Sequence, residues 1–274
     1  MKRVKVFKDF FLSNDSEIKF ILGPCQIESK QHVFEICDEI EKLSIKLDFK
    51  YIFKSSYDKA NRSSHKSRRG IGIKKGLDIL SQVREKYNCP VISDVHDTSQ
   101  CSIVKDFLDI IQIPAFLCRQ TDIIIEAAKT NLPINIKKGQ FLSPEAMTFA
   151  LDKVKSTGNK MVWACERGMT FGYSDLIVDA TSITRLKKLD TKVIMDCTHS
   201  VQKPNKTEGI TGGDPSLIES IALSAIATGA DGLFLEVHPN PSVAASDPHT
   251  MLELHKLREI LEKCLKIRSA LNNE

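Results

Sequence analysis

Eight short apolar runs rich in β-branched residues recur along the chain, and segments of helical periodicity separate them. The runs are residues 19–23, 51–55, 90–95, 109–113, 133–137, 161–165, 192–197 and 232–237. Strands buried on both faces read as unbroken apolar runs, as these do, whereas half-exposed strands alternate. Eight such strands alternating with helices over roughly 250 residues predict an α/β fold, a (β/α)8 TIM barrel. A doubly wound open sheet is the competing architecture.

The intervening segments carry helix signals of two kinds. Apolar residues fall at spacings of three and four in two series, which are Val33, Cys37, Ile40, Leu43 and Leu47, and Met251, Leu254, Leu257, Leu261 and Cys264. Ser143 and Asp214 each place a capping side chain before a proline at the first helical position. These patterns predict helices between the strands.

The first dozen residues do not fit the repeat. We expect residues 4–12 to form a short strand or hairpin that closes the barrel floor. The sequence has no linker, low-complexity tract or break in composition, so we expect one barrel domain over residues 1–274.

Composition excludes several classes of protein. The formal net charge is only +4, with 39 basic and 35 acidic residues among 274, so a nucleic-acid site would have to be local. No segment approaches the ~20 apolar residues that span a bilayer, and the amino terminus lacks a signal-peptide run. Eight cysteines without a CxxC pair suit reduced thiols. We therefore expect a cytoplasmic protein that binds neither nucleic acid nor membrane.

Polar residues stand where the predicted strands end. They are Cys25, Lys54 with Lys59, Asp94 with His96, Gln112, Lys137 with Lys138, Glu166 with Arg167, Asp196 with His199, and Glu236 with His238. In TIM barrels the catalytic groups come from the carboxyl ends of the strands and the loops that follow. This arrangement predicts a polar, ligand-binding mouth.

Three of these residues, Lys54, Lys137 and Arg167, would bring positive charge from separate strands into one cavity. Converging cations need an anion, and a phosphate or carboxylate ligand would satisfy them, with Arg167 able to bind in a bidentate manner. The alternative is that each cation pairs with a neighbouring carboxylate such as Asp94 or Glu166.

A thiol, an imidazole and two carboxylates form a second constellation, made of Cys25, His199, Glu236 and Asp247. Such a set suits a divalent transition metal, and the sulfur disfavours magnesium or calcium. The spacing alone leaves other interpretations open. A lone cysteine is often a small buried hydrophobe, and Asp247 before Pro248 also reads as a helix N-cap.

The sequence resembles a known enzyme family along nearly its whole length and in the same order. The matching motifs are GPCQIES (23–29), KSSYDKANRSS (54–64), SDVH (93–96), QIPAFLCRQTD (112–122), NIKKGQFLSP (135–144), CERG (165–168), FGY (171–173), DCTHSVQ (196–202) and FLEVHPNP (234–241). They resemble the 3-deoxy-D-manno-octulosonate 8-phosphate synthases. The sister heptulosonate synthases typically have a KPR-type motif where this chain has KANRSS.

The resemblance implies a transferase that condenses phosphoenolpyruvate with arabinose 5-phosphate in the biosynthesis of 3-deoxy-D-manno-octulosonate (KDO) for lipopolysaccharide. It implies catalytic roles for Lys54, Lys59, Asp94, Lys137 and His199. Substrate contacts would come from Ser56, Asn61, Arg62, Ser63, Gln112, Phe116, Arg167 and Gln202. Lys59, Lys137 and Arg167 would hold phosphoenolpyruvate, and residues 61–63 would hold the sugar phosphate.

Cofactor and assembly also follow from the resemblance. Members with cysteine at the position of Cys25 look metal-dependent, so the resemblance implies one divalent transition metal per subunit (iron, zinc, manganese or cobalt), held by Cys25, His199, Glu236 and Asp247. No organic cofactor is expected. The family implies a homotetramer in which Phe116 reaches a neighbouring site.

Three rival functions remain at this point. The nearest is a heptulosonate synthase that uses erythrose 4-phosphate. The second is an aldolase that forms a Schiff base on Lys54 or Lys137. The third is a phosphate-binding or RNA-binding protein built on an inactive barrel.

Overall fold

The computed structural model describes residues 17–61, 68–171, 175–204 and 211–272. The strand or hairpin expected at residues 4–12 therefore lies outside the described residues, as do Arg62 and Ser63.

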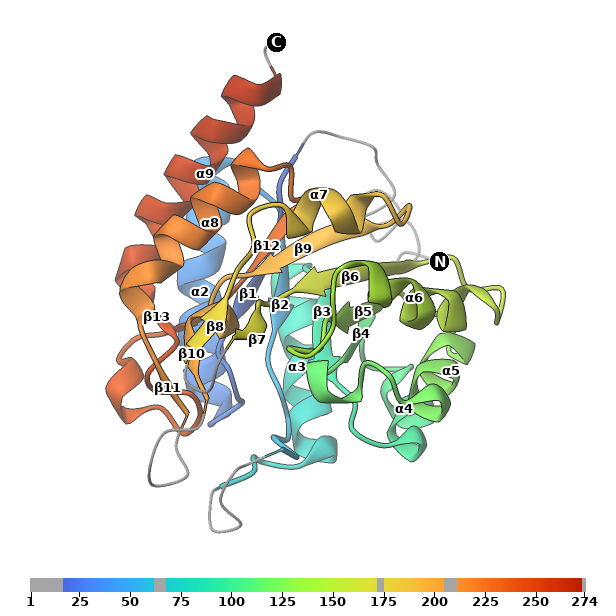
Figure 1. Ribbon diagram of the computed structural model, residues 1–274. Helices are drawn as coiled ribbons and strands as arrows, with labels where there is room; N and C mark the ends of the chain where they lie inside the picture. Colours follow the sequence, from blue (N-terminus) through green and yellow to red (C-terminus); the bar gives the residue numbers. More distant parts are fainter. Residues whose placement is uncertain (1–16, 62–67, 172–174, 205–210, 273–274) are drawn as a thin grey trace.

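Eight parallel strands form a closed barrel (Figure 1). They are β1 (Lys19–Gly23), β2 (Tyr51–Lys54), β3 (Val91–Asp94), β4 (Ile110–Ile113), β5 (Ile134–Lys137), β6 (Val162–Glu166), β9 (Lys192–Asp196) and β12 (Gly232–His238). Each strand pairs with the next in this order, and β12 pairs with β1 to close the ring. All eight apolar runs become strands, which confirms the predicted (β/α)8 barrel.

Helices cover the outside of the barrel (Figure 1). They are α2 (Lys30–Leu47), α3 (Ile73–Tyr87), α4 (Thr98–Val104), α5 (Thr121–Lys129), α6 (Thr148–Lys155), α7 (Ser182–Lys187), α8 (Ile218–Ala227) and α9 (Leu257–Asn272). Each buries apolar side chains; α2, for example, buries Val33, Ile36, Cys37 and Ile40 at helical spacing.

The predicted caps at two prolines are confirmed. The Asp214 side chain accepts a hydrogen bond from the backbone N–H of Ser216 at 3.2 Å, and the Ser143 hydroxyl accepts one from Ala146 at 3.3 Å. A single 3-10 turn follows each cap and leads into α8 and α6. The side-chain acceptors satisfy backbone donors that have no partner within a helical turn.

The helix expected from Met251 begins later than the periodicity suggests, at Leu257. Leu252 and Glu253 instead form β13, which pairs in parallel with the end of β12 (Val237 with Leu252). The apolar residues Met251 and Leu252 are buried by this extra pairing, so their spacing reflects a strand and a 3-10 turn, not a helix.

Two further hairpin-like pairs lie in the loops after β6 and β9. Strand β7 (Met169–Phe171) pairs with β8 (Asp175–Ile177), and β10 (Gln202–Lys203) pairs with β11 (Gly212–Gly213). These additions extend the loops at the carboxyl ends of the strands, where the polar residues gather.

An apolar layer fills the barrel, and a polar layer lies above it. The apolar layer contains Ile21, Ile52, Ile92, Ile110, Trp163, Cys165, Ile194 and Phe234. Side chains two residues apart on a strand point to the same face, so the residue two positions further along also points inward. On five strands that next residue is polar and buried: Lys54, Asp94, Gln112, Asp196 and Glu236. Strand alternation thus places the site directly on the packed interior.

The described residues include no helix that combines the length and the apolar character needed to cross a bilayer.

The interior layer predicts a stability difference between two isoleucines. Ile92 is fully buried in it, whereas Ile45 on α2 is 74% exposed. We expect Ile92→Ala to lower the free energy of unfolding by about 2–5 kcal/mol, because the truncation leaves a cavity in a packed interior. Ile45→Ala, the matched control, should change it by less than about 0.5 kcal/mol. Urea unfolding followed by circular dichroism measures both, and similar losses would contradict the burial difference.

Candidate active site

A polar cavity of about 560 Å³ opens at the carboxyl ends of the strands. Its lining includes Lys54, Lys59, Asn61, Arg68, Asp94, His96, Gln112, Phe116, Lys137, Gln140, Phe141, Arg167, His199, Gln202 and Asp247. The predicted residues from six strands are therefore brought together as barrel geometry requires. Cys25, Ser56 and Glu236 are buried and contact lining residues.

Arg167 brings a buried cation to this cavity from the end of β6. It is 4% exposed, and its Nη2 donates to Oε1 of Gln202 at 2.5 Å. Its Nη1 is buried and has no hydrogen-bond partner. Burial lowers the pKa of Arg167 from its usual value, although a guanidinium stays charged in proteins. A charged donor left without a partner points to an anionic ligand.

Lys137, at the end of β5, is held by two groups from β9 and the turn after it. Its Nζ lies 2.6 Å from Oδ2 of Asp196 and 3.3 Å from Nδ1 of His199. Burial would lower the pKa of Lys137, but the Asp196 carboxylate raises it above its usual value. The amine is therefore protonated at neutral pH, in the form that binds an anion.

Lys54 on β2 and Glu236 on β12 form a buried ion pair; their strands lie on either side of β1. Their Nζ and Oε1 atoms are 2.5 Å apart, and both side chains are almost fully buried. Nζ of Lys59 lies 4.0 Å from the same oxygen. Burial would raise the pKa of Glu236, but His199 and the two lysines hold it well below its usual value. Negative charge on Glu236 thus fixes the position of Lys54.

Asp94 organises the part of the cavity wall at the ends of β2, β3 and β4. It accepts hydrogen bonds from the hydroxyl of Ser56 and the amide of Gln112, and Asn135 in turn donates to Gln112 at 2.8 Å. Burial would raise the pKa of Asp94, but Lys54 and Lys59 keep it well below the usual value. Ser56 is therefore a partner of Asp94 below the cavity.

The candidate metal ligands converge although they are distant in sequence. One donor atom from each of Cys25, Glu236 and Asp247 lies within 4.8 Å of the others. Nε2 of His199 lies 3.4 Å from Oε2 of Glu236, and that oxygen is buried with no hydrogen-bond partner. One thiol, one imidazole and two carboxylates can supply the four ligands that zinc or iron takes from proteins. The residues present fit such an ion.

Asp247 is not a helix N-cap, which settles one of the alternatives that the spacing left open. Its backbone has φ of 48°, in the left-handed region, and it is followed by a turn and β13. Its side chain lies 3.1 Å from Sγ of Cys25 and 3.3 Å from Nε2 of Gln202.

The sequence left open whether each converging cation pairs with a carboxylate instead of a ligand. Lys54 and Lys137 do pair with carboxylates, whereas Arg167 does not. The carboxylates also differ from those expected. Lys54 pairs with Glu236 and Lys137 with Asp196. Glu166 pairs with Lys138 at 3.3 Å and accepts from the backbone of Arg167 and Gly168.

Sequence reasoning missed several residues of this site. Arg68 and Gln140 line the cavity but were not among the predicted site residues. Ser246 is buried and bonded to both Cys25 and Asp247. In the sequence, Ser246 is marked only by its place next to Asp247, and the other residues only by their place in loops that follow the strands.

The chain was compared with known proteins. A family model described as the DAHP synthetase I family matches residues 3–273. The chain belongs to this family. Three relatives are each called 2-dehydro-3-deoxyphosphooctonate aldolase. They come from Desulfotalea psychrophila (45% identity; 96% of this chain and 94% of the relative), Rickettsia bellii (44%; 97% and 97%) and Bartonella tribocorum (44%; 96% and 95%).

These relatives confirm the resemblance that the sequence motifs predicted. Their name is a synonym of 3-deoxy-D-manno-octulosonate 8-phosphate synthase. The alignments with these relatives extend over almost the whole chain, so they include every strand end that lines the cavity.

The depressed pKa of Asp94 predicts a pH-dependent stability. Its contribution is complete above the unfolded pKa of about 4 and is lost as the pH falls through the lower folded value. We expect Asp94→Asn to flatten the fall in unfolding free energy between pH 5 and pH 3 by up to about 1.4 kcal/mol per pH unit. Urea unfolding across this range measures the slope. Exposed Asp152→Asn should leave it unchanged, and an unaltered slope in Asp94→Asn would contradict the assignment.

Proposed function

We propose that the chain condenses phosphoenolpyruvate with D-arabinose 5-phosphate and water to give 3-deoxy-D-manno-octulosonate 8-phosphate and inorganic phosphate. The observation that carries the proposal is the buried Arg167, whose Nη1 lacks a partner at a cavity also lined by Lys54, Lys59 and Lys137. This anion pocket lies in a chain whose relatives are named for that product. The reaction is an aldol-type transfer that belongs to KDO biosynthesis.

The substrates bring about five negative charges, so fixed cations supply much of the binding energy. Arg167 and Lys137 hold the phosphate and carboxylate of phosphoenolpyruvate, with Lys59 beside them. Lys54 and Gln112 complete this end of the cavity. Asn61, with Arg62 and Ser63 outside the described residues, contacts the sugar phosphate, and Phe116 and Gln202 border the same space.

In the reaction, carbon 3 of phosphoenolpyruvate attacks the sugar aldehyde, whose oxygen takes up a proton. Water adds at carbon 2, and the bond between that carbon and the phosphate oxygen breaks. Lys137 and Arg167 remain protonated throughout and stabilise the phosphate as it leaves. Asp94 orients the Ser56 and Gln112 side chains at the cavity wall.

A divalent transition metal would be held by Cys25, His199, Glu236 and Asp247, and iron, zinc, manganese and cobalt all suit this donor set. When bound, such an ion supplies Lewis acidity toward the aldehyde or lowers the pKa of a bound water. The support is the convergence of three donors within 4.8 Å and the orphan Oε2 of Glu236. We propose no organic cofactor.

A Schiff-base aldolase is disfavoured by the state of its candidate lysines. Lys137 has a raised pKa beside Asp196, and Lys54 is fixed in a buried ion pair with Glu236. An amine must be unprotonated to attack a carbonyl, and lysines that form Schiff bases are activated by a lowered pKa. The paired lysines here suit anion binding instead.

Assembly and location are further parts of the proposal. We propose a homotetramer, supported by four exposed aromatic side chains: Phe116 and Phe141, which line the cavity, Phe149 on α6 and Phe171 on β7. A cytoplasmic location is supported by eight cysteines that are all free thiols. The extent of one domain over residues 1–274 also stays a prediction.

The choice of sugar is tested with two aldehydes. We expect product formation from phosphoenolpyruvate and arabinose 5-phosphate, with erythrose 4-phosphate used at least tenfold less efficiently. Mass spectrometry distinguishes the eight-carbon product from the seven-carbon product, and phosphate release gives the rate. Activity with erythrose 4-phosphate alone would assign the chain to the heptulosonate synthases.

The metal site is tested by removing its thiol. Loss of a residue that only hydrogen-bonds to a metal ligand already lowers metal affinity by about 10–100-fold. We therefore expect Cys25→Ala, which removes a ligand itself, to lose its bound metal on desalting and to have a kcat/KM at least about 100-fold lower. Cys101→Ala, which removes another buried thiol on α4, is the control and should keep both. Metal content is measured by mass spectrometry. Full occupancy in an active Cys25→Ala protein would contradict the ligand assignment.

A further inference from the structure

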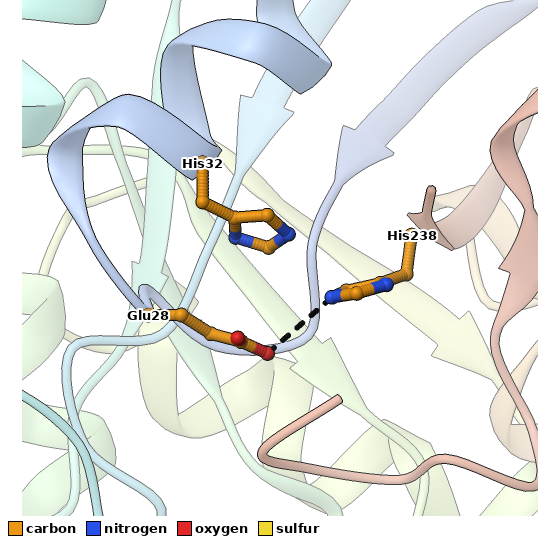
Figure 2. Close-up of side chains that lie close together, drawn as sticks. All are labelled: Glu28, His32 and His238. Atoms are coloured by element: carbon orange, nitrogen blue, oxygen red, sulfur yellow. Dashed lines mark ion pairs between the residues drawn. The ribbon is translucent and has the colours of Figure 1, made fainter. Parts of the chain in front are cut away.

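A second cluster of titratable groups lies beside the active site. Glu28 in the loop after β1, His32 on α2 and His238 at the end of β12 face one another (Figure 2). One donor atom from each lies within 4.8 Å of the other two, and His238 is 5% exposed. Such a set suggests either another metal site or a contact between protein segments.

The hydrogen bonds of His238 decide between the two. Its Nδ1 accepts from the backbone N–H of Asn240 at 3.0 Å, so in the neutral ring Nε2 carries the proton. Nε2 faces Oε1 of Glu28 at 3.5 Å (Figure 2). The nitrogen that faces the cluster therefore carries the proton, completes no hydrogen bond of its own, and has no lone pair for a metal. The geometry favours a contact between segments.

Glu28 also holds the loop that follows β12. Its Oε1 accepts from the backbone N–H of Ala245 at 2.9 Å. Ala245 stands two residues before Asp247, and Glu28 stands three residues after Cys25. One carboxylate oxygen thus joins the segment that carries Cys25 to the segment that carries Asp247.

The loop needs such an anchor because of its own conformation. Asp247 has a left-handed backbone, which costs a residue other than glycine about 1 kcal/mol or more. Beyond Asp247 the loop is tied to β12 by the pairing of Leu252 with Val237. Before Asp247, the bond from Ala245 to Glu28 provides the corresponding attachment.

We propose that Glu28 is a positioning residue that fixes the loop of residues 239–247 through Ala245 and so places Asp247 against Cys25. His238 lies 3.5 Å from the same carboxylate oxygen, at ion-pair distance. The inference deepens the proposed function, because it rests on the metal site formed by those two ligands. Mutation of a residue that positions a metal ligand without binding the metal itself typically lowers metal affinity by about 10–100-fold.

Glu28→Ala is the first test. We expect cobalt affinity, measured by chelator competition, to fall about 10–100-fold, and the amide of Ala245 to exchange hydrogen faster because it loses its acceptor. The same protein should keep a wild-type circular dichroism spectrum. When assayed with saturating cobalt, kcat should recover, because Glu28 does not touch the reacting atoms.

Three further variants make the test specific. Glu28→Gln keeps an oxygen at Oε1 for both Ala245 and His238 and should restore cobalt affinity to within about threefold of wild type. Glu28→Asp keeps the charge but shortens the reach, so it should resemble Glu28→Ala and serves if that variant fails to fold. Glu35→Ala, which removes an exposed glutamate from α2 nearby in the sequence, is the control and should behave as wild type.

The wild-type protein and the variants answer separate questions. Cobalt binding that depends on Cys25 in the wild type tests the proposed metal site, and the ratio between Glu28→Ala and wild type tests the anchor. Unchanged affinity and exchange in Glu28→Ala and Glu28→Asp would overturn the anchor and leave the proposed function standing. If the wild type bound no cobalt, the metal site would fall, and faster exchange at Ala245 would still support the anchor. A second equivalent of cobalt, lost in a His32→Ala variant, would overturn it in favour of a second metal site.

Discussion

The pairing of β1 with β12 is the constraint on which the site depends. Closure of the barrel places Gly23 opposite Glu236 in register, which brings the first and last strands together from positions more than 200 residues apart. Cys25 and Asp247 follow these strands and meet at their ends. Gly23 itself has φ of 152°, and a Cβ there would lie 2.0 Å from the backbone oxygen of Lys54. Only glycine allows β1 and β2 to approach this closely before the chain turns toward Cys25.

The same closure explains how so many charges can be buried. Burying an ion is costly unless a partner compensates for the lost water. Lys54 is compensated by Glu236 over the intervening strand β1, and Lys137 by Asp196 over the intervening strand β6. The carboxylates therefore hold the lysines in place before any ligand arrives. Arg167 differs, because its partner Gln202 is neutral. An anionic ligand therefore gains the most electrostatic stabilisation at the end of the cavity where Arg167 lies.

The strands were the most predictable part of the fold. Each of the eight apolar runs became a strand with boundaries shifted by at most one residue, because strands buried on both faces are predominantly apolar along their length. The helix start at Met251 was wrong because β13 buries the same apolar residues by pairing with β12. Spacing alone could not distinguish these two ways of burying a side chain.

The site was predictable in its membership and less so in its contacts. Position at a strand end identified Lys54, Asp94 and Lys137 as inward-facing residues. The pairings depend on which strands are neighbours and on side-chain length, and a linear sequence contains neither. Arg68 and Ser246 lie in loops, where no periodicity indicates the direction of a side chain.

The groups around Cys25 have opposite effects on its thiol with and without a cation. Burial, and after it the negative charge of Glu236, raises the pKa of Cys25 well above its usual value, and Asp247 adds to this. Without a cation these carboxylates keep the sulfur protonated. A divalent ion among the same atoms would favour the thiolate, since a coordinating thiol is deprotonated. The carboxylates would then be ligands and not repelling charges. The donor atoms of Cys25, Glu236 and Asp247 lie within 4.8 Å of one another, and this convergence is the physical argument that the three residues belong to one site.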